Sequence, residues 1–326
     1  FQAEDGIRDF CLSRGLGDVY KRQALNQEVK KNIDTTNATK AYINEIRNQI
    51  IDNQASKLFE DLKWIQLENI SSNKSDLFPT VLTGKGNKIL LIHGFDSCFL
   101  EYRRLIPILK KKNKLIIPDL YGFGFCPRSS GNKYGFKYLM KHLNSILNHF
   151  SNNQPIGVIG ASMGGALALE LARQNPKKVN KLLLLSPAGL AGKNPKIPWP
   201  FNHLGAFFLS RPFVRRGLCK QAFADPTNSV GPAEEQIASI HLKVPGWQSS
   251  LADFAADGGV SGCGLPKPTQ PLKIILGKYD RIIPKNEKEE TYRNYNSNIE
   301  IALNSGHLPH LEEPKLVADA WGKLKK

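Results

Sequence analysis

Apolar runs and amphipathic stretches alternate along most of this chain, and the alternation restricts the folds open to it. The apolar runs that indicate strands lie at 88–94, 114–120, 155–160, 181–187, 272–277 and 298–303. Helix patterns stand between or beside them, in "EYRRLIPILKK", "FKYLMKHLNSILNHF", "MGGALALELARQN" and "EKEETYRNY". Near-continuous apolar strands need cover on both faces, which intervening helices supply. The pattern therefore predicts an α/β fold with a mostly parallel, doubly wound sheet.

The alternation is interrupted after the fourth of these strands. Residues 188–270 hold aromatic, proline-rich and glycine-rich pieces such as "PWPFNHLGAFFLSRPF" and "DGGVSGCG". We interpret them as a helical cap inserted over the sheet edge. Residues 64–187 and 271–326 then form the core. Residues 24–63 are expected to form an N-terminal helical extension, because apolar residues within 41–62 recur at the spacing of one amphipathic helix.

The first 23 residues have a different origin by our interpretation. Both "QAEDGIRD" and "SRGLGDVYKRQ" read as translations of DNA that resembles sequencing-library adapters. We therefore predict that residues 1–23 are a translated adapter that contributes nothing to folding, and we exclude them. They carry four basic and four acidic residues, so the formal net charge of +16 belongs to residues 24–326.

The positive charge does not by itself indicate a nucleic-acid-binding protein. Lysines and arginines are dispersed, and the sequence has no zinc-finger, RNA-recognition or basic-zipper signature. It also has no run of about 18 apolar residues that would indicate a spanning helix. Cys98, Cys126, Cys219 and Cys263 are far apart and form no C-x-x-C pair. This usage favours reduced thiols in a cytoplasmic protein and no metal site.

The stretch "GASMGG" at 160–165 joins an apolar strand to a helix pattern, and Ser162 is either a nucleophile or a small turn residue. The G-x-S-x-G pattern alone is weak evidence, because short motifs recur by chance. Its position adds weight, since ligands of an open α/β sheet bind at the carboxyl ends of the strands. Gly160 and Gly164 would let the strand and the helix approach closely in a tight turn.

A serine nucleophile needs an imidazole base and a carboxylate that orients the base. Asp280 follows the apolar strand "LKIILG", and His307 follows the next strand. The order Ser162, Asp280, His307 is that of α/β-hydrolases. Asp119 is a competing acid, but it precedes Ser162, so we assign it to organising its own loop. His310 is a competing base, and we prefer His307 because it directly follows a glycine at the end of the strand.

A fourth element is the stretch "LLIHGFD", in which His93 and Gly94 end a strand. This ending leaves the backbone N–H of Phe95 available beside that of Met163, and the two predict an oxyanion hole. One lost oxyanion donor costs about 3–4 kcal/mol in the transition state. Four elements in the expected order therefore predict that Ser162 is a nucleophile.

Over roughly residues 60–326 the chain resembles the Ser-dependent α/β-hydrolases. The stretches "HGFDSCFLEYRRL", "PDLYGFGFCPR", "GASMGG", "LGKYDRII" and "GHLPHLEEP" are similar to those of the cyanobacterial and plastid branch that includes chlorophyll dephytylase-like hydrolases. Part of the cap, residues 211–247, is similar to members of the same branch. Cys98 and Cys126 depart from it, since they stand where such proteins often have Ser. This difference leaves the triad intact and allows a change in pocket polarity.

We expect a carboxylic-ester hydrolase that acts on a lipophilic small molecule and needs no metal or organic cofactor. Epoxide hydrolases and haloalkane dehalogenases of this fold use an Asp nucleophile, so Ser162 argues against them. Three alternatives stay open. They are a cofactor-free haloperoxidase, a carbon–carbon bond hydrolase with the same triad, and a hydrolase-fold ligand receptor with little turnover.

An aromatic cluster lies near the start of the cap and is followed by Arg215 and Arg216. Its apolar side chains are Trp199, Phe201, Leu204, Phe207, Phe208, Leu209, Phe213 and Val214. One interpretation is that this cluster packs onto the core and lines the pocket. The other is that part of its apolar face is exposed and makes weak peripheral contact with an anionic membrane, as interfacial helices do. Both interpretations predict an apolar pocket.

Overall fold

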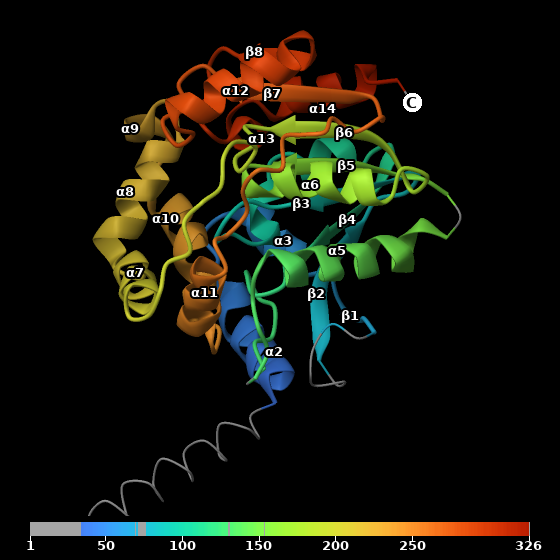
Figure 1. Cartoon of the computed structure of the whole chain (residues 1–326). Helices are drawn as coiled ribbons and strands as arrows, with labels where there is room; N and C mark the ends of the chain where they lie inside the picture. The colour runs from blue at the N-terminus through green and yellow to red at the C-terminus, as the bar shows by residue number, and fades with distance from the viewer. Residues whose placement is uncertain (1–33, 69, 71–75, 130, 153, 326) are drawn as a thin grey trace, which may run out of the picture.

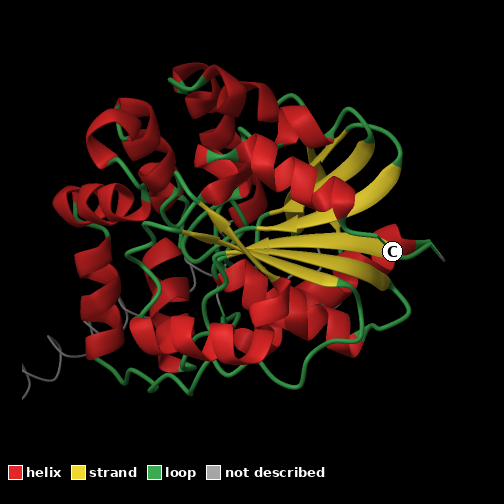
Figure 2. Ribbon diagram, turned by 90° about the horizontal axis from the view of Figure 1, so that it is seen from above, coloured by secondary structure: helices red, strands yellow, loops and turns green. Residues whose placement is uncertain are grey.

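The computed structural model describes residues 34–68, 70, 76–129, 131–152 and 154–325, and the predicted adapter segment at 1–23 lies outside them. The described part forms one eight-stranded sheet in the order β1-β2-β4-β3-β5-β6-β7-β8 (Figures 1 and 2). Its strands are β1 Leu62–Gln66, β2 Leu77–Thr83, β3 Asn87–Ile92, β4 Asn113–Pro118, β5 Ile156–Ala161, β6 Val179–Leu185, β7 Leu272–Gly277 and β8 Ile299–Ala302.

The sheet is parallel from β4 to β8, whereas β1 pairs with β2 and β2 with β4 in antiparallel register. The predicted α/β class with a mostly parallel sheet is confirmed. The sequence pattern missed β1 and β2. Strand β1 is an edge strand whose side chains are only half-buried or exposed, so its sequence "LKWIQ" lacks the continuous apolar character of the central strands.

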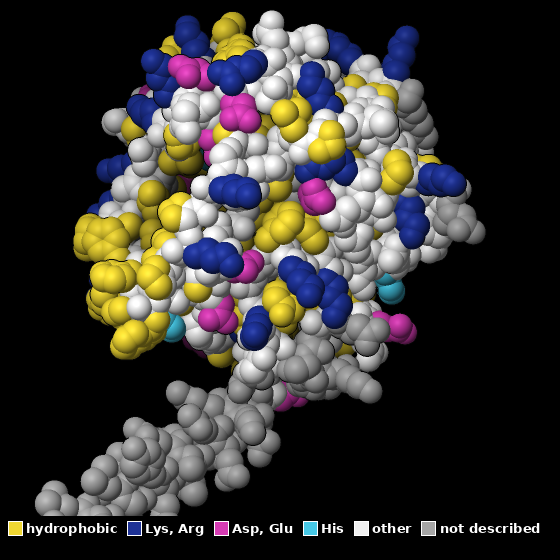
Figure 3. Space-filling view, in the orientation of Figure 1, with side chains coloured by type: hydrophobic (Ala, Val, Ile, Leu, Met, Phe, Trp, Pro, Cys, Tyr) yellow, Lys and Arg dark blue, Asp and Glu magenta, His cyan; other side chains and the backbone are white. Residues whose placement is uncertain are grey.

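Residues 188–270, which we call the cap segment, connect β6 to β7 and are largely helical. Their helices are α7 Phe201–Leu209, α8 Pro212–Ala222, α9 Pro226–Ser229, α10 Pro232–Ser239, η3 Ile240–Lys243 and α11 Trp247–Ala256. Figure 1 shows them together on one side of the sheet. In the space-filling view, hydrophobic side chains gather on the surface over α7 (Figure 3).

The remaining helices cover the two faces of the sheet and its edges. They are α2 Thr35–Ile46, η1 Arg47–Gln49, α3 Asn53–Leu58, η2 Phe99–Tyr102, α4 Ile106–Leu109, α5 Phe136–Ser151, α6 Met163–Gln174, α12 Lys285–Tyr295, η4 Asn296–Asn298, α13 Pro309–Glu312 and α14 Pro314–Lys323. Within the described ranges, none of these helices, nor any in the cap segment, combines the length and apolar character needed to cross a membrane.

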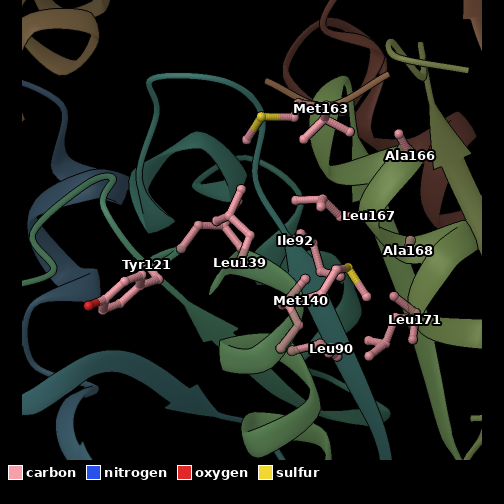
Figure 4. Packing of buried hydrophobic residues seen from close by; sticks show 14 of the residues in the cluster. Leu90, Ile92, Tyr121, Leu139, Met140, Met163, Ala166, Leu167, Ala168 and Leu171 are labelled. Carbon is pink, nitrogen blue, oxygen red and sulfur yellow. The ribbon is translucent and has the colours of Figure 1, made fainter. Parts of the chain in front are cut away.

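Alternate side chains of β3 belong to two separate hydrophobic clusters, one on each face of the sheet. Leu90 and Ile92 pack with side chains of α5 and α6, as Figure 4 shows. Ile89 and Leu91 belong to the opposite cluster, which includes Val317 of α14. Because successive residues of a strand point to opposite faces, a continuous apolar run such as "ILLI" fits a strand covered on both sides.

The single helix predicted over 41–62 is wrong. The chain forms α2, η1 and α3 instead, because Ile50 adopts an extended backbone conformation between η1 and α3. The Asp52 side chain accepts hydrogen bonds from the backbone N–H groups of Gln54 and Ala55, so it caps the start of α3. The apolar spacing survives the break, since Ile43 of α2 and Ile50 are both buried in the core.

The helix predicted for "EYRRLIPILKK" is also largely wrong. The stretch contains the end of η2 and the four-residue α4, with the segment between them outside regular structure. Pro107 lies in the first turn of α4 and has no N–H to continue a helix from η2. Arg103, between η2 and α4, is 2 % exposed and is held by ion pairs with Asp52 and Glu234.

Candidate active site

Ser162 lies in a sharp turn between β5 and α6. Its backbone has φ 51 and ψ −123, a positive φ that residues with a side chain rarely adopt. A Cβ at Gly160 would collide with the carbonyl of Gly164, and a Cβ at Gly164 would collide with the carbonyl of Ile92. The glycines on either side therefore permit the close strand-to-helix approach that raises Ser162 at the carboxyl end of β5.

The structure brings the three predicted side chains into one hydrogen-bonded chain. His307 Nε2 lies 2.8 Å from Ser162 Oγ, and His307 Nδ1 lies 2.9 Å from Asp280 Oδ2. Asp280 follows β7, and His307 follows β8. The backbone N–H of His307 donates to the carbonyl of Ala222 at 2.7 Å, which fixes the turn that carries His307. These distances suit proton transfer between a hydroxyl and an imidazole.

Asp280 is held as an ionised acceptor. Burial raises its pKa, but the hydrogen bond and charge of His307 and the backbone N–H groups of Ile283 and Ile282 lower that pKa below its ordinary value. The Ile282 and Ile283 amides donate to Oδ1, at 2.8 and 3.1 Å respectively, and leave Oδ2 to His307. A carboxylate at Nδ1 favours the tautomer with a proton there, so Nε2 is free to accept the proton of Ser162.

The predicted oxyanion donors flank the serine. Met163 is the first residue of α6, where backbone N–H groups have no acceptor within the helix. Phe95 follows Gly94, whose N–H donates to Glu101 Oε2 at 3.1 Å. A Cβ at Gly94 would lie 3.2 Å from the Cβ of Ser162, so the loop after β3 passes directly against the serine. Phe95 and Ser162 also line the same cavity.

Asp96, to which sequence reasoning gave no role, joins this loop to the cap segment. Its Oδ1 accepts from Trp247 Nε1 at 2.8 Å and from His241 Nε2 at 3.0 Å, and its Oδ2 pairs with Arg215. Burial raises the pKa of Asp96, but the hydrogen bonds from His241 and Trp247 and the charge of Arg215 hold it well below its ordinary value. In the sequence, the one feature that could have pointed to Asp96 is its position directly after Phe95. Its hydrogen-bond and ion-pair partners could not be found in this way, because they lie 119 to 151 residues later in the chain.

The rival acid and base have other contacts. Asp119 accepts backbone N–H bonds from Phe99 and Phe125, each at 2.6 Å, and so holds together two loops. Burial outweighs these amides and raises the pKa of Asp119 to about 7. His310 is fully buried, and its Nε2 lies 3.3 Å from Glu101 Oε1. Glu101 lines the same cavity as Ser162, so His310 supports its wall, whereas Asp119 organises its own loops.

A cavity of about 250 Å³ contains Ser162 and His307 in its wall. Most of its other lining side chains are apolar, and they include Leu209, Leu218, Phe223, Ile237 and Leu311. In the described part of the chain, Cys98 and Cys126 are not among the lining residues, so the pocket-polarity change that their presence allowed is not found. Burial raises the pKa of both thiols well above the ordinary value.

Comparison with known proteins agrees with the family that the sequence resembles, and the agreement covers most of the chain. The alpha/beta hydrolase family profile matches residues 89–320. The uncharacterized hydrolase YugF of Bacillus subtilis is 27% identical over 71% of this chain and 87% of its own length. The 2-hydroxy-6-oxo-2,4-heptadienoate hydrolase of Pseudomonas putida is 26% identical over 62% of this chain and 75% of its own length. The magnesium-chelatase 30 kDa subunit of Rhodobacter capsulatus is 31% identical over 69% of this chain and 82% of its own length.

A solved structure agrees at the level of the fold. The esterase EaEST from Exiguobacterium antarcticum superposes with a TM-score of 0.64 at 19% identity, covering 80% of this chain and 97% of that one. Its sequence similarity is too low to transfer an activity. Together with the profile match over residues 89–320, the shared fold leads to one conclusion: the chain belongs to the alpha/beta hydrolase family.

Proposed function

We propose that this protein is a serine hydrolase that cleaves a carboxylic ester of a lipophilic substrate through an acyl-enzyme. The observation that carries the proposal is the hydrogen-bonded chain from Ser162 through His307 to Asp280, with 2.8 and 2.9 Å between the paired atoms. A hydroxyl in this arrangement can lose its proton as it attacks, which is what nucleophilic acyl transfer requires.

The proposed reaction proceeds in two balanced halves. Ser162 Oγ attacks the acyl carbon while His307 Nε2 takes the hydroxyl proton, and the backbone N–H groups of Phe95 and Met163 stabilise the oxyanion. The intermediate collapses as His307 returns the proton to the leaving alcohol, which leaves the acyl group on Ser162. A water molecule then attacks the acyl-enzyme with His307 as base again, and the carboxylic acid is released with Ser162 restored.

The cavity wall favours a neutral ester over a substrate that carries a carboxylate. The heptadienoate hydrolase, by its name, acts on such an acid. Here the two arginines of the cavity wall already have acidic partners, Arg103 with Asp52 at 2.8 Å and Glu234 at 3.3 Å, and Arg215 with Asp96. A buried arginine that is already paired has little capacity for a second anion. This pairing ranks ester hydrolysis above carbon–carbon bond cleavage.

The surface of the cap segment supports a second proposal, a weak contact with anionic membranes. Six members of its aromatic cluster have side chains between 49 and 77 % exposed, namely Trp199, Phe201, Leu204, Phe207, Phe208 and Phe213. Figure 3 shows hydrophobic side chains gathered over this region. Exposed apolar patches of this kind mark interaction surfaces. This exposure favours the membrane interpretation over the one in which the whole cluster lines the pocket.

The charge near this patch has the sign that anionic lipids attract. Residues 193–220 contain no acidic residue and five exposed lysines and arginines, whereas Arg215, expected from the sequence to add to this charge, is buried against Asp96. Near a membrane surface each exposed basic side chain contributes roughly 1 kcal/mol at low salt. The apolar patch and the basic side chains therefore predict reversible binding that weakens as salt screens the charges.

Ester hydrolysis is tested with the purified chain and Ser162→Ala as the matched control. A fluorophosphonate should label the wild-type protein and not the variant. A series of p-nitrophenyl esters of rising chain length, together with a phytyl ester and a peroxide-dependent halogenation assay, then defines the reaction. Steady turnover of an ester supports the proposal. Labelling without turnover of any ester would favour a receptor, and halogenation alone would favour a haloperoxidase.

Membrane contact is tested by co-sedimentation with anionic and neutral liposomes at low and high salt. The variant Trp199→Ser/Phe213→Ser removes two of the most exposed aromatic side chains without touching the core. Leu303→Ser, at a 60 % exposed leucine after β8, is the matched control. We expect wild type and Leu303→Ser to sediment with anionic liposomes at low salt and the double variant to remain in solution. No sedimentation of the wild type with anionic liposomes at low salt would refute the membrane role.

A further inference from the structure

We propose that a second cavity, under α7, binds the long hydrocarbon chain of the substrate and continues the catalytic cavity toward the exposed patch. This inference rests on the ester hydrolysis proposed for Ser162. The cavity has a volume of about 330 Å³ and lies between α7, α11 and the chain at 194–197. We call it the α7–α11 groove. Its lining includes Ile197, Phe201, Ala206, Leu251 and Phe254.

The groove and the catalytic cavity share two lining residues, Phe95 and Leu209. Leu209 is the last residue of α7 and is partly buried. The Phe95 ring lies 5.8 Å from the ring of Phe254, which lines the groove, while the backbone of Phe95 is at the proposed oxyanion hole. Two apolar side chains thus form the wall common to both spaces, and the proposal requires that a chain attached to the reacting ester pass between them into the groove.

The chemistry of the groove suits a hydrocarbon. Among the described residues, none that lines it carries a charge. The NH₂ groups of its two amide side chains are bonded to the protein, Asn202 to the carbonyl of Ala252 at 3.2 Å and Asn194 to the carbonyl of Val260 at 3.3 Å. Among the described residues, the buried Oδ1 of Asn202 has no hydrogen-bond donor, and as an acceptor it cannot hold an ester, which also offers only acceptors. An apolar cavity of about 150 Å³ holds a benzene molecule, so the groove has room for on the order of a dozen carbon atoms. It offers no group that would hold the polar ester itself.

The outer end of the groove meets the surface patch. Ile197 and Phe201 line the groove and are 41 and 64 % exposed. Phe201 also belongs to the aromatic cluster proposed to contact the membrane. The path therefore runs from an apolar surface, through an apolar groove, to the serine. A lipid chain following it would stay out of water along the way.

The experiment compares two glycines of the cap segment that differ in one respect. Gly205 of α7 lines the groove, whereas Gly217 of α8 does not, and an added Cβ at either one meets nothing within 4 Å. Gly205→Phe should fill the groove, and Gly217→Phe is its matched control. Activity is measured with p-nitrophenyl esters from acetate to laurate and with alkyl acetates from methyl to dodecyl. The two series place the long chain on the acyl and on the alcohol side.

We expect Gly205→Phe to lose at least tenfold in kcat/KM for the twelve-carbon substrate of one series while its activity on the short esters is unchanged. Gly217→Phe should keep the wild-type profile in both. A wild-type chain-length profile for Gly205→Phe in both series would overturn the proposal. If Gly205→Phe does not fold, as judged by circular dichroism, Ala255→Phe fills the same groove from α11 and is subject to the same two outcomes.

Failure of the proposed function is distinguished by a measurement that needs no turnover. A pyrene-labelled dodecanol is titrated against the same variants in a Ser162→Ala background and followed by fluorescence. Binding that is lost in Gly205→Phe and kept in Gly217→Phe supports the groove even if no ester is hydrolysed. Absent binding in the parent protein, or equal binding in both variants, overturns it.

Discussion

Replacement of Asp96 by alanine should destabilise the protein and slow the reaction together. The Asp96 carboxylate is buried and contacts three side chains of the cap segment, Arg215, His241 and Trp247. Removing one partner of a buried ion pair costs about 3–5 kcal/mol, because the other charge stays buried without compensation. For a chain of this size roughly 2 °C is lost per kcal/mol, so the melting temperature should fall by about 6–10 °C.

The kinetic effect follows from the position of Asp96 beside Phe95. If the carboxylate holds the loop that carries the Phe95 N–H, its loss displaces an oxyanion donor, which costs about 10²–10³ in kcat. Asp96→Asn should recover part of the stability, since an amide oxygen still accepts from Trp247 while the charge opposite Arg215 is gone. Thermal unfolding by circular dichroism and steady-state ester hydrolysis measure both effects.

The matched control is Asp225→Ala, which removes an exposed carboxylate of the cap segment that caps α9 through the amides of Thr227 and Asn228. A lost cap of this type costs about 1 kcal/mol. Arg215→Met in the Asp96→Ala background should restore part of the stability, because it removes the stranded charge. Equal melting temperatures for Asp96→Ala and Asp225→Ala would refute the reasoning.

The same carboxylate predicts a pH dependence. The pKa of Asp96 is lower in the folded protein than its ordinary value of about 3.9. Its contribution to stability is therefore complete above pH 4 to 5 and is lost as the pH falls through the ordinary value toward the folded one. Asp96→Asn should lose less stability than wild type between pH 5 and pH 3. Parallel curves for the two proteins would contradict the assignment.

Three further predictions concern the site itself. Ser162→Ala and His307→Ala should each lower kcat on the order of 10⁶-fold with unchanged circular dichroism, and Asp280→Asn should cost less. His310→Ala should lower kcat far less than His307→Ala, and an inactive His310→Ala beside an active His307→Ala would show that the base is misassigned. Asp119→Asn places an NH₂ group against a backbone N–H donor, so urea unfolding should report a loss of about 1–3 kcal/mol. An unchanged free energy of unfolding would show that Asp119 does not hold its loops.

Local patterns in the sequence were enough to predict the central sheet. The runs that became β3, β4, β5, β6 and β7 each end in at least four buried, mostly apolar residues, and a buried parallel strand requires that composition. The run that became β8, at the sheet edge, is only half-buried over its first three residues. The turn at Ser162 could also be predicted, because small residues directly after an apolar strand are a local signal for a tight turn, and the structure shows that turn with a positive φ at Ser162. Asp280 and His307 followed from chain order and from their places after β7 and β8.

The tertiary structure decided what depends on distant partners. The helical spacing within 41–62 indicated which residues are buried but not that the chain turns at Ile50, where Asp52 both caps α3 and pairs with Arg103. The edge strand β1 is defined by its pairing with β2 and by little in its own composition.

Asp96 shows the same limit most clearly. Its three partners lie 119, 145 and 151 residues further along the chain, and no local period or turn preference relates residues so far apart. The α7–α11 groove is likewise made by two helices separated in sequence. Periodicity and turn chemistry, which act over a few residues, thus determined the sheet and the serine turn. Packing between remote segments alone decided how Asp96 is joined to the cap segment and where the α7–α11 groove lies.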